Sequence, residues 1–280
     1  MCELGKRLGV GANAEVYEYG EGKVIKLFFN RQLAGGIHNE LKNTMAVWQL
    51  GLPVPRPYEI VEMDDRPGLV MEQIKGEPLV ARMFGEHHLD QMRLLARVLH
   101  QIQSAPGDAV SASGLRSIKG TLAWQAYNQT ELTGAERRLV AHALADLPDG
   151  NCVCHGDFHM LNVMMKGETP VVIDWQGANT GDRCYDVMQL FLLLRYAVIP
   201  AGMLPQDAIN GFYATREAME RTFLEEYHAL TGVTQEEIEA WFLPCAASRL
   251  STSVLPEEHD AVLAELRRRL AGMGAVVRQG

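Results

Sequence analysis

The hydrophobic pattern of this chain changes near residue 75, and that change limits the folds that its 280 residues can adopt. Before it, short β-rich runs alternate with turn residues, and a single helical pattern at 38–50 ends at Gly51. After it, longer patterns of helical period dominate. The sequence therefore predicts an α+β chain in two lobes: a small β-rich lobe with one helix at residues 1–74, and a larger, mainly helical lobe at residues 75–280.

The individual elements follow from periodicity and from the turn residues between them. Residues 105–117 combine proline, glycine and serine, which predicts a loop. No internal repeat or low-complexity segment interrupts the order of elements. Strands are expected at 23–29, 58–63 and 68–74, and helices at 89–102, 121–130, 135–146, 185–196, 207–230, 235–252 and 257–273.

Charge and hydropathy argue against two classes of partner. The net charge of −9 disfavours nucleic acid, because phosphate backbones attract lysine and arginine; it is compatible with a cationic substrate or with solubility alone. The longest apolar run, 187–200, contains Gln189 and Arg195 and falls short of the roughly 20 residues that span a bilayer. The N-terminus lacks the layout of a secretory signal. We therefore expect a cytoplasmic protein with no membrane or nucleic-acid partner, whose oligomeric state stays open.

Five cysteines are scattered along the chain, which predicts free thiols rather than a disulfide framework. Cys152, Cys154, His155 and His159 lie close enough in sequence to raise the question of a zinc site. The Cys-x-Cys spacing is not the usual gap of two to four residues, and no second Cys/His pair follows. We therefore expect these cysteines to pack at the end of a strand rather than to bind metal.

The predicted β-rich lobe contains residues that are typical of phosphate binding. Gly9 and Gly11 lie in the segment LGVGANAEVY, where backbone N–H groups can approach a phosphate closely. Lys26 lies on a strand with one free face, and Glu40 near the start of the next helix could hold its ammonium group in an ion pair. Each of these features, considered alone, has an ordinary explanation. The two glycines could belong to a hairpin, and Lys26 and Glu40 could simply face solvent.

Two motifs supply the carboxylates and the amide that phosphoryl transfer requires. One is HGDFHMLN, from His155 to Asn162, and the other is VVIDW, which ends at Trp175. Asp157 could orient an attacking hydroxyl, while Asn162 and Asp174 offer oxygen ligands for Mg²⁺. Asp157 alone could be a turn residue, and Asp174 a carboxylate at the end of a strand. Their order and spacing together favour a phosphotransfer site.

These motifs resemble those of the aminoglycoside phosphotransferase and choline kinase branch of the protein-kinase-like superfamily. HGDFHMLN looks like the branch's H-G-D-x-x-x-x-N catalytic loop, and VVIDW looks like its metal motif. Gly156, in place of the arginine of protein kinases, favours the small-molecule branch. The resemblance covers about residues 5–200 and implies a two-lobed protein-kinase-like fold. Supporting matches lie at 51–55, 71–76, 95–100 and 181–186.

The resemblance implies roles for the residues of the larger lobe. Asp157 would be the catalytic base, and Asn162 and Asp174 would bind Mg²⁺. His155 and Asp186 would support the catalytic loop rather than react. The implied cofactors are therefore ATP and Mg²⁺, with GTP as an alternative nucleotide.

The resemblance also implies that residues 1–74 bind the nucleotide and that residues 75–280 carry catalysis and substrate binding. Lys26 would contact the α- and β-phosphates, with Glu40 as its partner. The other implied nucleotide contacts are Gly9, Gly11 and Asn13 over the phosphates, Met71 behind the adenine, and the backbone of Glu72 and Ile74 at the edge of the base. Ala14 replaces the third glycine of the loop, and every catalytic position is present.

The function implied is ATP-dependent transfer of the γ-phosphoryl group to a hydroxyl of a small polar, possibly cationic, molecule, as in aminoglycoside phosphotransferases. A kinase of choline, homoserine, a sugar or a similar metabolite is the alternative. A Ser/Thr protein kinase is disfavoured, because eleven residues between Trp175 and Val187 leave little room for an activation loop. A non-catalytic nucleotide-binding module is also disfavoured. Candidate carboxylates for a cationic acceptor are Asp182, Glu220, Glu225 and Glu226.

Overall fold

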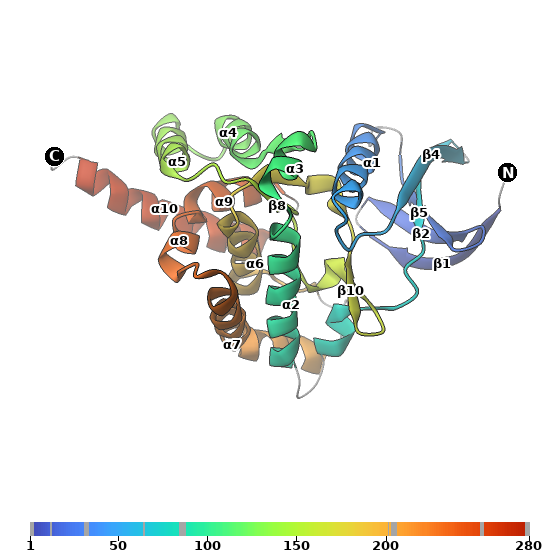
Figure 1. Ribbon diagram of the computed structural model, residues 1–280. Helices are drawn as coiled ribbons and strands as arrows, with labels where there is room; N and C mark the ends of the chain where they lie inside the picture. The colour runs from blue at the N-terminus through green and yellow to red at the C-terminus, as the bar shows by residue number, and fades with distance from the viewer. Residues whose placement is uncertain are drawn as a thin grey trace.

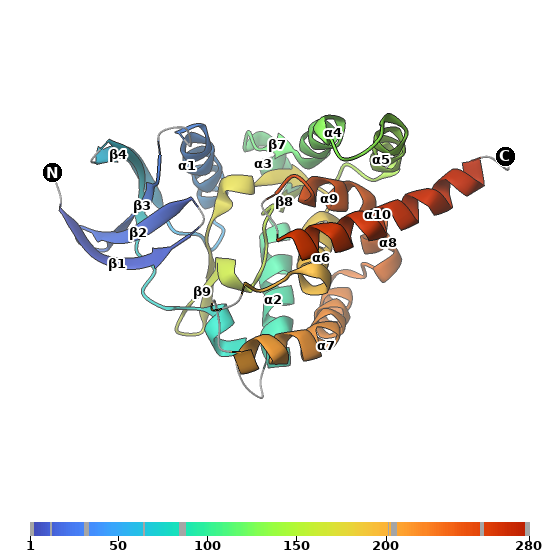
Figure 2. The ribbon, with the colours of Figure 1, turned by 180° about the vertical axis from the view of Figure 1, so that it is seen from behind.

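The computed structural model describes residues 3–11, 13–30, 34–63, 65–83, 88–200, 202, 206–252 and 255–277. A β-sheet with one helix forms one lobe, and most of the chain after residue 88 forms a helical second lobe (Figure 1). The view from behind shows the same division, with the two chain ends on opposite sides of the molecule (Figure 2). The expected α+β, two-lobed architecture is confirmed.

The sheet of the N-terminal lobe is antiparallel, with the strand order β1-β2-β3-β5-β4. Strand β3 lies in the middle, with Val16 of β2 opposite Lys26 on one side and Leu69 of β5 opposite it on the other. The elements of this lobe are β1 (Leu4–Val10), β2 (Ala14–Tyr19), β3 (Lys23–Phe28), α1 (Ala34–Gln49), β4 (Pro57–Met63) and β5 (Arg66–Glu72).

Alternation along β3 decides where Lys26 points. Ile25 and Leu27 pack with Val70 on one face of the sheet. Phe28 packs on the opposite face, in a cluster that includes Ile37 of α1. Because successive side chains of a strand point to opposite faces, Lys26 shares the face of Phe28 and projects toward α1. Both faces of β3 are thus covered, and the lysine lies between sheet and helix rather than in open solvent.

Two small sheets hold the loops that contain the predicted catalytic loop and the predicted metal motif. One has the order β10-β9-β6 and the other β7-β11-β8. The predicted catalytic loop runs from the end of β8 to the start of β9, and the predicted metal motif ends β10. The elements are β6 (Glu77–Pro78), β7 (Arg116–Ser117), β8 (Cys152–Cys154), β9 (Val163–Lys166), β10 (Thr169–Val172) and β11 (Asn179–Gly181), with short 3₁₀ turns η2 (Leu79–Met83), η3 (Met160–Asn162) and η4 (Trp175–Gly177).

The helices of the second lobe surround α6, most of whose side chains are buried. Long helices α2 and α7 pack against each other, and α9 packs against α4, α5, α6 and α10. Among the described residues, no helix has the length and apolar character needed to cross a membrane. The bounds are α2 (His88–Gln103), α3 (Gly107–Ala112), α4 (Ile118–Asn128), α5 (Gly134–Asp146), α6 (Cys184–Tyr196), α7 (Gln206–Thr231), α8 (Gln235–Glu239), α9 (Phe242–Arg249) and α10 (Pro256–Val277).

Two sequence expectations about this lobe were wrong. The helix expected at 235–252 is divided into α8 and α9, because Pro244 has no N–H to donate and fits only in a first helical turn, where it lies in α9. The loop expected at 105–117 contains the short helix α3, which buries Val110. The boundary between residues 74 and 75 stays a prediction; β5 ends at Glu72, and β6 begins at Glu77 in the other sheet.

The segment between the lobes generates a stability prediction. A Cβ atom at Gly76 would lie far inside van der Waals contact with the carbonyl oxygen of Met165. Gly76→Ala would therefore push β6 away from β9, and we expect a loss of about 1–3 kcal/mol of stability, seen as a lower melting temperature. Gly211→Ala is the matched control: it lies on α7 with open space at Cβ, and we expect a gain of about 0.5–1 kcal/mol. A Gly76→Ala protein that melts at or above the wild-type temperature would contradict this packing.

Candidate active site

Lys26 joins the two lobes through a pair of carboxylates. Its ammonium nitrogen lies 2.9 Å from both carboxylate oxygens of Glu40 on α1 and 3.0 Å from Oδ1 of Asp174, which follows β10. Burial lowers the pKa of Lys26, but the negative charges of Glu40 and Asp174 outweigh that effect and hold it above its ordinary value. The lysine is therefore a fixed cation, and the sequence-predicted residues Lys26, Glu40 and Asp174 lie together.

Helix α1 is fixed to the loop that follows Asp174 by a second contact. The side-chain amide of Asn43 donates to the backbone carbonyl of Gln176 at 3.0 Å and to that of Ala178 at 3.2 Å. Asn43 lies three residues after Glu40, so the two side chains share a face of the helix. One helix face thus holds both the lysine of the N-terminal lobe and the loop of the second lobe. Asn43 could not be identified from the sequence, because nothing in its local pattern distinguishes it from a solvated helix residue.

Asp174 has a left-handed backbone, with φ of 65° and ψ of 61°. Such a conformation is uncommon outside glycine, although aspartate tolerates it better than most residues. The next residue anchors the turn, since the buried indole of Trp175 donates from Nε1 to the carbonyl oxygen of Val172 at 2.9 Å. The turn places the carboxylate of Asp174 toward Lys26, with 41% of its side chain exposed.

Asp157 and Asn162 face each other across the catalytic loop. The side-chain amide of Asn162 donates to the backbone carbonyl of Asp157 at 2.8 Å and to its Oδ2 at 3.3 Å. These bonds use the N–H groups of the amide and leave its oxygen for another partner. The N–H of Ile173 donates to the carbonyl of Asn162 at 2.9 Å, which brings Asn162 beside the residue before Asp174.

His159 is a further member of this group that the sequence analysis did not assign. Its Nδ1 accepts from the backbone N–H of Leu161 at 3.2 Å, and its Nε2 lies 3.4 Å from the side-chain nitrogen of Asn162. Nε2 lies 3.4 Å from Oδ2 of Asp157. Partial burial raises the pKa of Asp157, but its interaction with the imidazole of His159 outweighs this and holds the pKa below the usual value. The signal that could have identified His159 is its position two residues after Asp157.

His155 supports the predicted catalytic loop through contacts of both its ring nitrogens. It is fully buried, its Nδ1 accepts from the N–H of Asp157 at 3.2 Å, and its Nε2 lies 2.9 Å from the carbonyl oxygen of Ile173. Burial lowers the pKa of this imidazole, so the neutral tautomer protonated at Nε2 satisfies both contacts. The ring also packs 4.6 Å from that of Trp175. His155 thus links the backbone of the catalytic loop to that of the metal motif.

Asp186, at the start of α6, holds the same loop through its backbone. Its two carboxylate oxygens accept from the N–H of His155 at 2.7 Å and from the N–H of Gly156 at 2.9 Å. Burial raises its pKa to about 6, which leaves it ionised at neutral pH. Gly156 has φ of 89°, and a Cβ atom there would overlap the carbonyl of Gly177. Glycine at this position is therefore required by the backbone, and an arginine would not fit.

The donor set around Asp174 fits Mg²⁺. The carboxylate of Asp174 and the amide oxygen of Asn162 are hard oxygen ligands, and Mg²⁺ is usually held by one or two protein oxygens together with phosphates and water. Among the described residues, no group of three or more histidine, cysteine, aspartate or glutamate side chains is arranged to hold a metal alone. The two oxygens therefore suit an ion that arrives with a nucleotide.

The glycine segment runs from the end of β1 into the turn before β2, and its glycines are not explained by packing. A Cβ atom at Gly9 would have nothing within 4 Å, and one at Gly11 would make only an ordinary contact with the carbonyl of Ala14. Neither residue has a positive φ angle. The turn is held by backbone bonds: Gly11 N–H donates to Ala14 at 2.8 Å, and Phe29 N–H donates to the carbonyl of Asn13 at 3.0 Å. The glycines thus leave room for another molecule.

The residues expected around an adenine lie where β5 ends. Met71 packs against the cluster on the α1 face of the sheet. The N–H of Glu72 donates to the carbonyl of Arg56 at 2.8 Å, and the N–H of the next residue, Gln73, donates to Gly22 at 2.9 Å. Within the described residues, the N–H of Ile74 makes no backbone hydrogen bond. It therefore offers a donor at the junction of the lobes.

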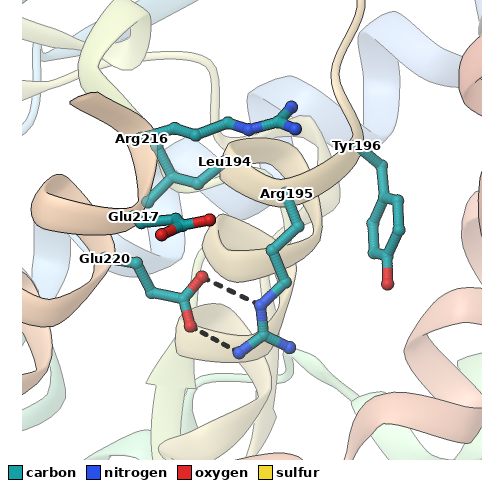
Figure 3. Close-up of a pocket in the computed structure, with 6 residues that line it drawn as sticks. All are labelled: Leu194, Arg195, Tyr196, Arg216, Glu217 and Glu220. Atoms are coloured by element: carbon teal, nitrogen blue, oxygen red, sulfur yellow. Dashed lines mark hydrogen bonds and ion pairs between the residues drawn. The ribbon is translucent and has the colours of Figure 1, made fainter. Parts of the chain in front are cut away.

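Three of the carboxylates considered for a cationic acceptor already have partners. Asp182 accepts from the backbone N–H of Cys184 at 2.8 Å at the start of α6. Glu226 is paired with Arg97 at 2.7 Å. Glu220 binds Arg195 through both oxygens, beside a pocket of about 200 Å³ between α6 and α7 (Figure 3). That pocket lies at the opposite end of α6 from Asp186, so it is separate from the catalytic loop. Of the four carboxylates, Glu225 is exposed on α7.

Several solved structures have the same architecture as this chain. A thermostable mutant of aminoglycoside phosphotransferase APH(4)-Ia, in a ternary complex with ADP and hygromycin B, has a TM-score of 0.62 at 17% identity, over 99% of this chain and 94% of that one. An aminoglycoside-3'-phosphotransferase of type VIII has a TM-score of 0.58 at 23% identity, over 86% and 91% of the two chains. A choline/ethanolamine kinase family protein from Mesorhizobium loti has a TM-score of 0.57 at 16% identity, over 99% and 93%.

No curated protein matches the sequence of this chain. The structural likenesses, all below 25% identity, establish the fold. The model of the phosphotransferase enzyme family matches residues 5–227, which include every site residue described above. The family resemblance noted from HGDFHMLN and VVIDW is thereby confirmed, and the chain belongs to the phosphotransferase enzyme family.

Proposed function

We propose that this phosphotransferase transfers the γ-phosphoryl group of ATP, bound with Mg²⁺, to a hydroxyl of a small polar acceptor. The observation that carries the proposal is the meeting of Lys26 and Asp174 at 3.0 Å, because a cation and a carboxylate together across the lobes are what the phosphates and the Mg²⁺ of a bound nucleotide would need. Two similar solved structures support it, since one is a complex with ADP and hygromycin B and another a complex with ATP and streptomycin.

In the proposed reaction, the residues of the two lobes share the positioning of the nucleotide. Lys26, held by Glu40, would bind the α- and β-phosphates, and the free backbone of the glycine segment would lie over them. Asp174 and the amide oxygen of Asn162 would hold Mg²⁺, which supplies charge neutralisation at the phosphates when bound. The N–H of Ile74 would donate to the edge of the base, beside Met71.

Asp157 would act on the acceptor. Its lowered pKa keeps it a carboxylate at neutral pH, so it can accept a hydrogen bond from the acceptor hydroxyl and aim its oxygen at the γ-phosphorus. The proton would reach Asp157 late, as the oxygen–phosphorus bond forms, because the transition state of phosphoryl transfer is loose. The imidazole of His159, whose Nε2 lies 3.4 Å from Oδ2 of Asp157, would help to orient the carboxylate.

The short connection after the metal motif favours a small acceptor over a protein. Strand β11 starts at Asn179 and α6 at Cys184, so the chain enters regular structure soon after Trp175. Protein kinases use a long activation loop at this point to bind their substrates. The acceptor classes consistent with this short connection are small alcohols that carry an amine, an acid or no charged group.

Replacement of Asp157 tests the chemistry. Asp157→Ala and Asp157→Asn are expected to lower kcat by about 10²- to 10⁴-fold, because the acceptor hydroxyl loses its orienting carboxylate. The measurement is ADP release with Mg-ATP over a panel of aminoglycosides, amino alcohols, hydroxy acids, sugars and nucleosides. Asp149→Asn, the same change at a carboxylate that is 88% exposed, is the control and should keep full activity. A wild-type protein that never exceeds Asp157→Ala with any acceptor would refute the proposal.

Replacement of Gly9 tests the nucleotide site separately. Because a Cβ atom at Gly9 meets nothing in the structure, Gly9→Ala should leave the melting temperature unchanged. We expect KM for ATP to rise several-fold, since the methyl group would occupy space that the phosphates need. Gly211→Ala on α7 is the matched control for KM. An unchanged KM for ATP in Gly9→Ala would place the phosphates elsewhere.

A further inference from the structure

Helix α1 belongs to the cores of both lobes. Near its N-terminus, Ile37 packs on the sheet in one apolar cluster with Phe28 of β3. Further along, Val47 is fully buried in the large core of the second lobe, which also contains Trp175 of the metal motif. Val54, shortly after the helix, belongs to that second core as well. The helix therefore packs against both the sheet and the segment of the metal motif.

The turn of the metal motif is bound to this part of the chain on both of its sides. Before the turn, the N–H of Val172 donates to the carbonyl oxygen of Pro53 at 2.7 Å. After the turn, the carbonyl oxygens of Gln176 and Ala178 accept from Nδ2 of Asn43 at 3.0 Å and 3.2 Å. Both partners of Asn43 are acceptors, so only a side chain with N–H groups can satisfy them. Helix α1 and the residues that follow it thus hold the turn through its backbone.

Gly36 lets the same loop approach α1 closely. A Cβ atom there would lie 2.7 Å from the side-chain nitrogen of Gln176, which is closer than the two atoms can pack. Gly36, Glu40 and Asn43 have the i, i+4, i+7 spacing of a single helix face. That face therefore presents, in order, a close approach for the loop, the carboxylate that holds Lys26, and the amide that holds the loop.

The backbone of Asp174 is left-handed, with φ of 65°, and it depends on the contacts around it. A non-glycine residue in that region is unfavourable and persists where the surrounding structure fixes it. Trp175 fixes one side of the turn from within the second lobe, because its indole N–H donates to Val172. Asn43 fixes the other side from α1, through the backbone that follows the turn.

The ion pair with Lys26 would not supply this support once a nucleotide is bound. In the proposed reaction, the ammonium group of Lys26 binds the phosphates and the carboxylate of Asp174 binds Mg²⁺. The hydrogen bonds of Asn43 go to backbone oxygens and do not depend on that ion pair. They would therefore keep the turn in the same place with and without nucleotide.

We propose, on the basis of the phosphotransfer described above, that Asn43 is a positioning residue for the metal site. Its amide holds the turn in the conformation that directs the carboxylate of Asp174 to Mg²⁺, and it acts through the backbone rather than by contact with the ion. Glu40, on the same helix face, holds Lys26 for the phosphates instead. Loss of the amide weakens the part of ATP binding that depends on Mg²⁺ and spares the part that does not.

Calorimetric titration of ATP, once with Mg²⁺ and once with EDTA, tests the proposal. The ratio of the two Kd values, EDTA over Mg²⁺, measures how much the metal contributes to binding. In Asn43→Ala we expect this ratio to fall about fivefold or more, while the Kd in EDTA stays within about twofold of the wild type, because Lys26 keeps its contact with Glu40. Asn39→Ala, the same change at an exposed residue of α1, is the matched control and should leave both Kd values unchanged.

A second variant separates the hydrogen bonds of Asn43 from its packing. Asn43→Leu keeps the branched shape of the side chain and has no N–H group, so it should lower the ratio as Asn43→Ala does. It also covers the case in which the shorter side chain impairs folding. Three results overturn the proposal: an unchanged ratio in Asn43→Ala, a ratio restored by leucine, or a rise of both Kd values by the same factor, which would mean that Asn43 only holds α1 in place.

The same titrations separate this inference from the function on which it rests. If the wild type binds no ATP, or binds it equally well in Mg²⁺ and in EDTA, the proposed nucleotide site fails, and the role of Asn43 fails with it. If the wild type binds ATP more tightly with Mg²⁺ but the ratio is the same in Asn43→Ala, the nucleotide site stands and the role of Asn43 is refuted.

Discussion

The ion pair between Lys26 and Asp174 is the contact on which the arrangement of the site depends. It brings the central strand of the N-terminal sheet within 3.0 Å of the turn that follows β10. Glu40 holds the lysine from α1, and Asn43 on the same helix holds the loop after Asp174. A partly buried cation between two carboxylates is stable only where its partners are fixed, so α1 must keep its place for the pair to form.

The catalytic loop depends on backbone contacts more than on its own side chains. Asp186 accepts hydrogen bonds from the backbone N–H groups of His155 and Gly156. The neutral imidazole of His155 makes hydrogen bonds with the backbone of Asp157 and of Ile173. These bonds leave the carboxylate of Asp157 free to be oriented by Asn162 and His159. A loop held this way can present a carboxylate without large rearrangement, which is what positioning catalysis requires.

Local motifs explain why part of the site could be predicted from the sequence. Asp157, Asn162 and Asp174 lie in two short segments whose residue types and spacing indicate phosphotransfer, and the structure brings those segments together. The α+β architecture in two lobes likewise follows from hydrophobic period alone. The role of each site residue stays a prediction.

The remaining contacts depend on tertiary packing, which local patterns do not encode. Asn43 reaches the site from α1, and it resembles an ordinary helix residue in sequence. Glu220 and Glu226 could be expected from the sequence to be free to bind a cationic acceptor. Their ion-pair partners, Arg195 for Glu220 and Arg97 for Glu226, lie far from them along the chain. The division of the helix at 235–252 could have been anticipated from Pro244, whose missing N–H suits only a first turn.

The central claim is that the cation held between Glu40 and Asp174 marks the phosphate site. Calorimetric titration of Mg-ATP into the wild type and Lys26→Met tests it most directly, with Lys166→Met on the exposed end of β9 as the control. The account predicts that Lys26→Met binds Mg-ATP at least tenfold more weakly, about 1.4 kcal/mol, while Lys166→Met binds as the wild type does. Equal Kd values for the wild type and Lys26→Met would contradict it.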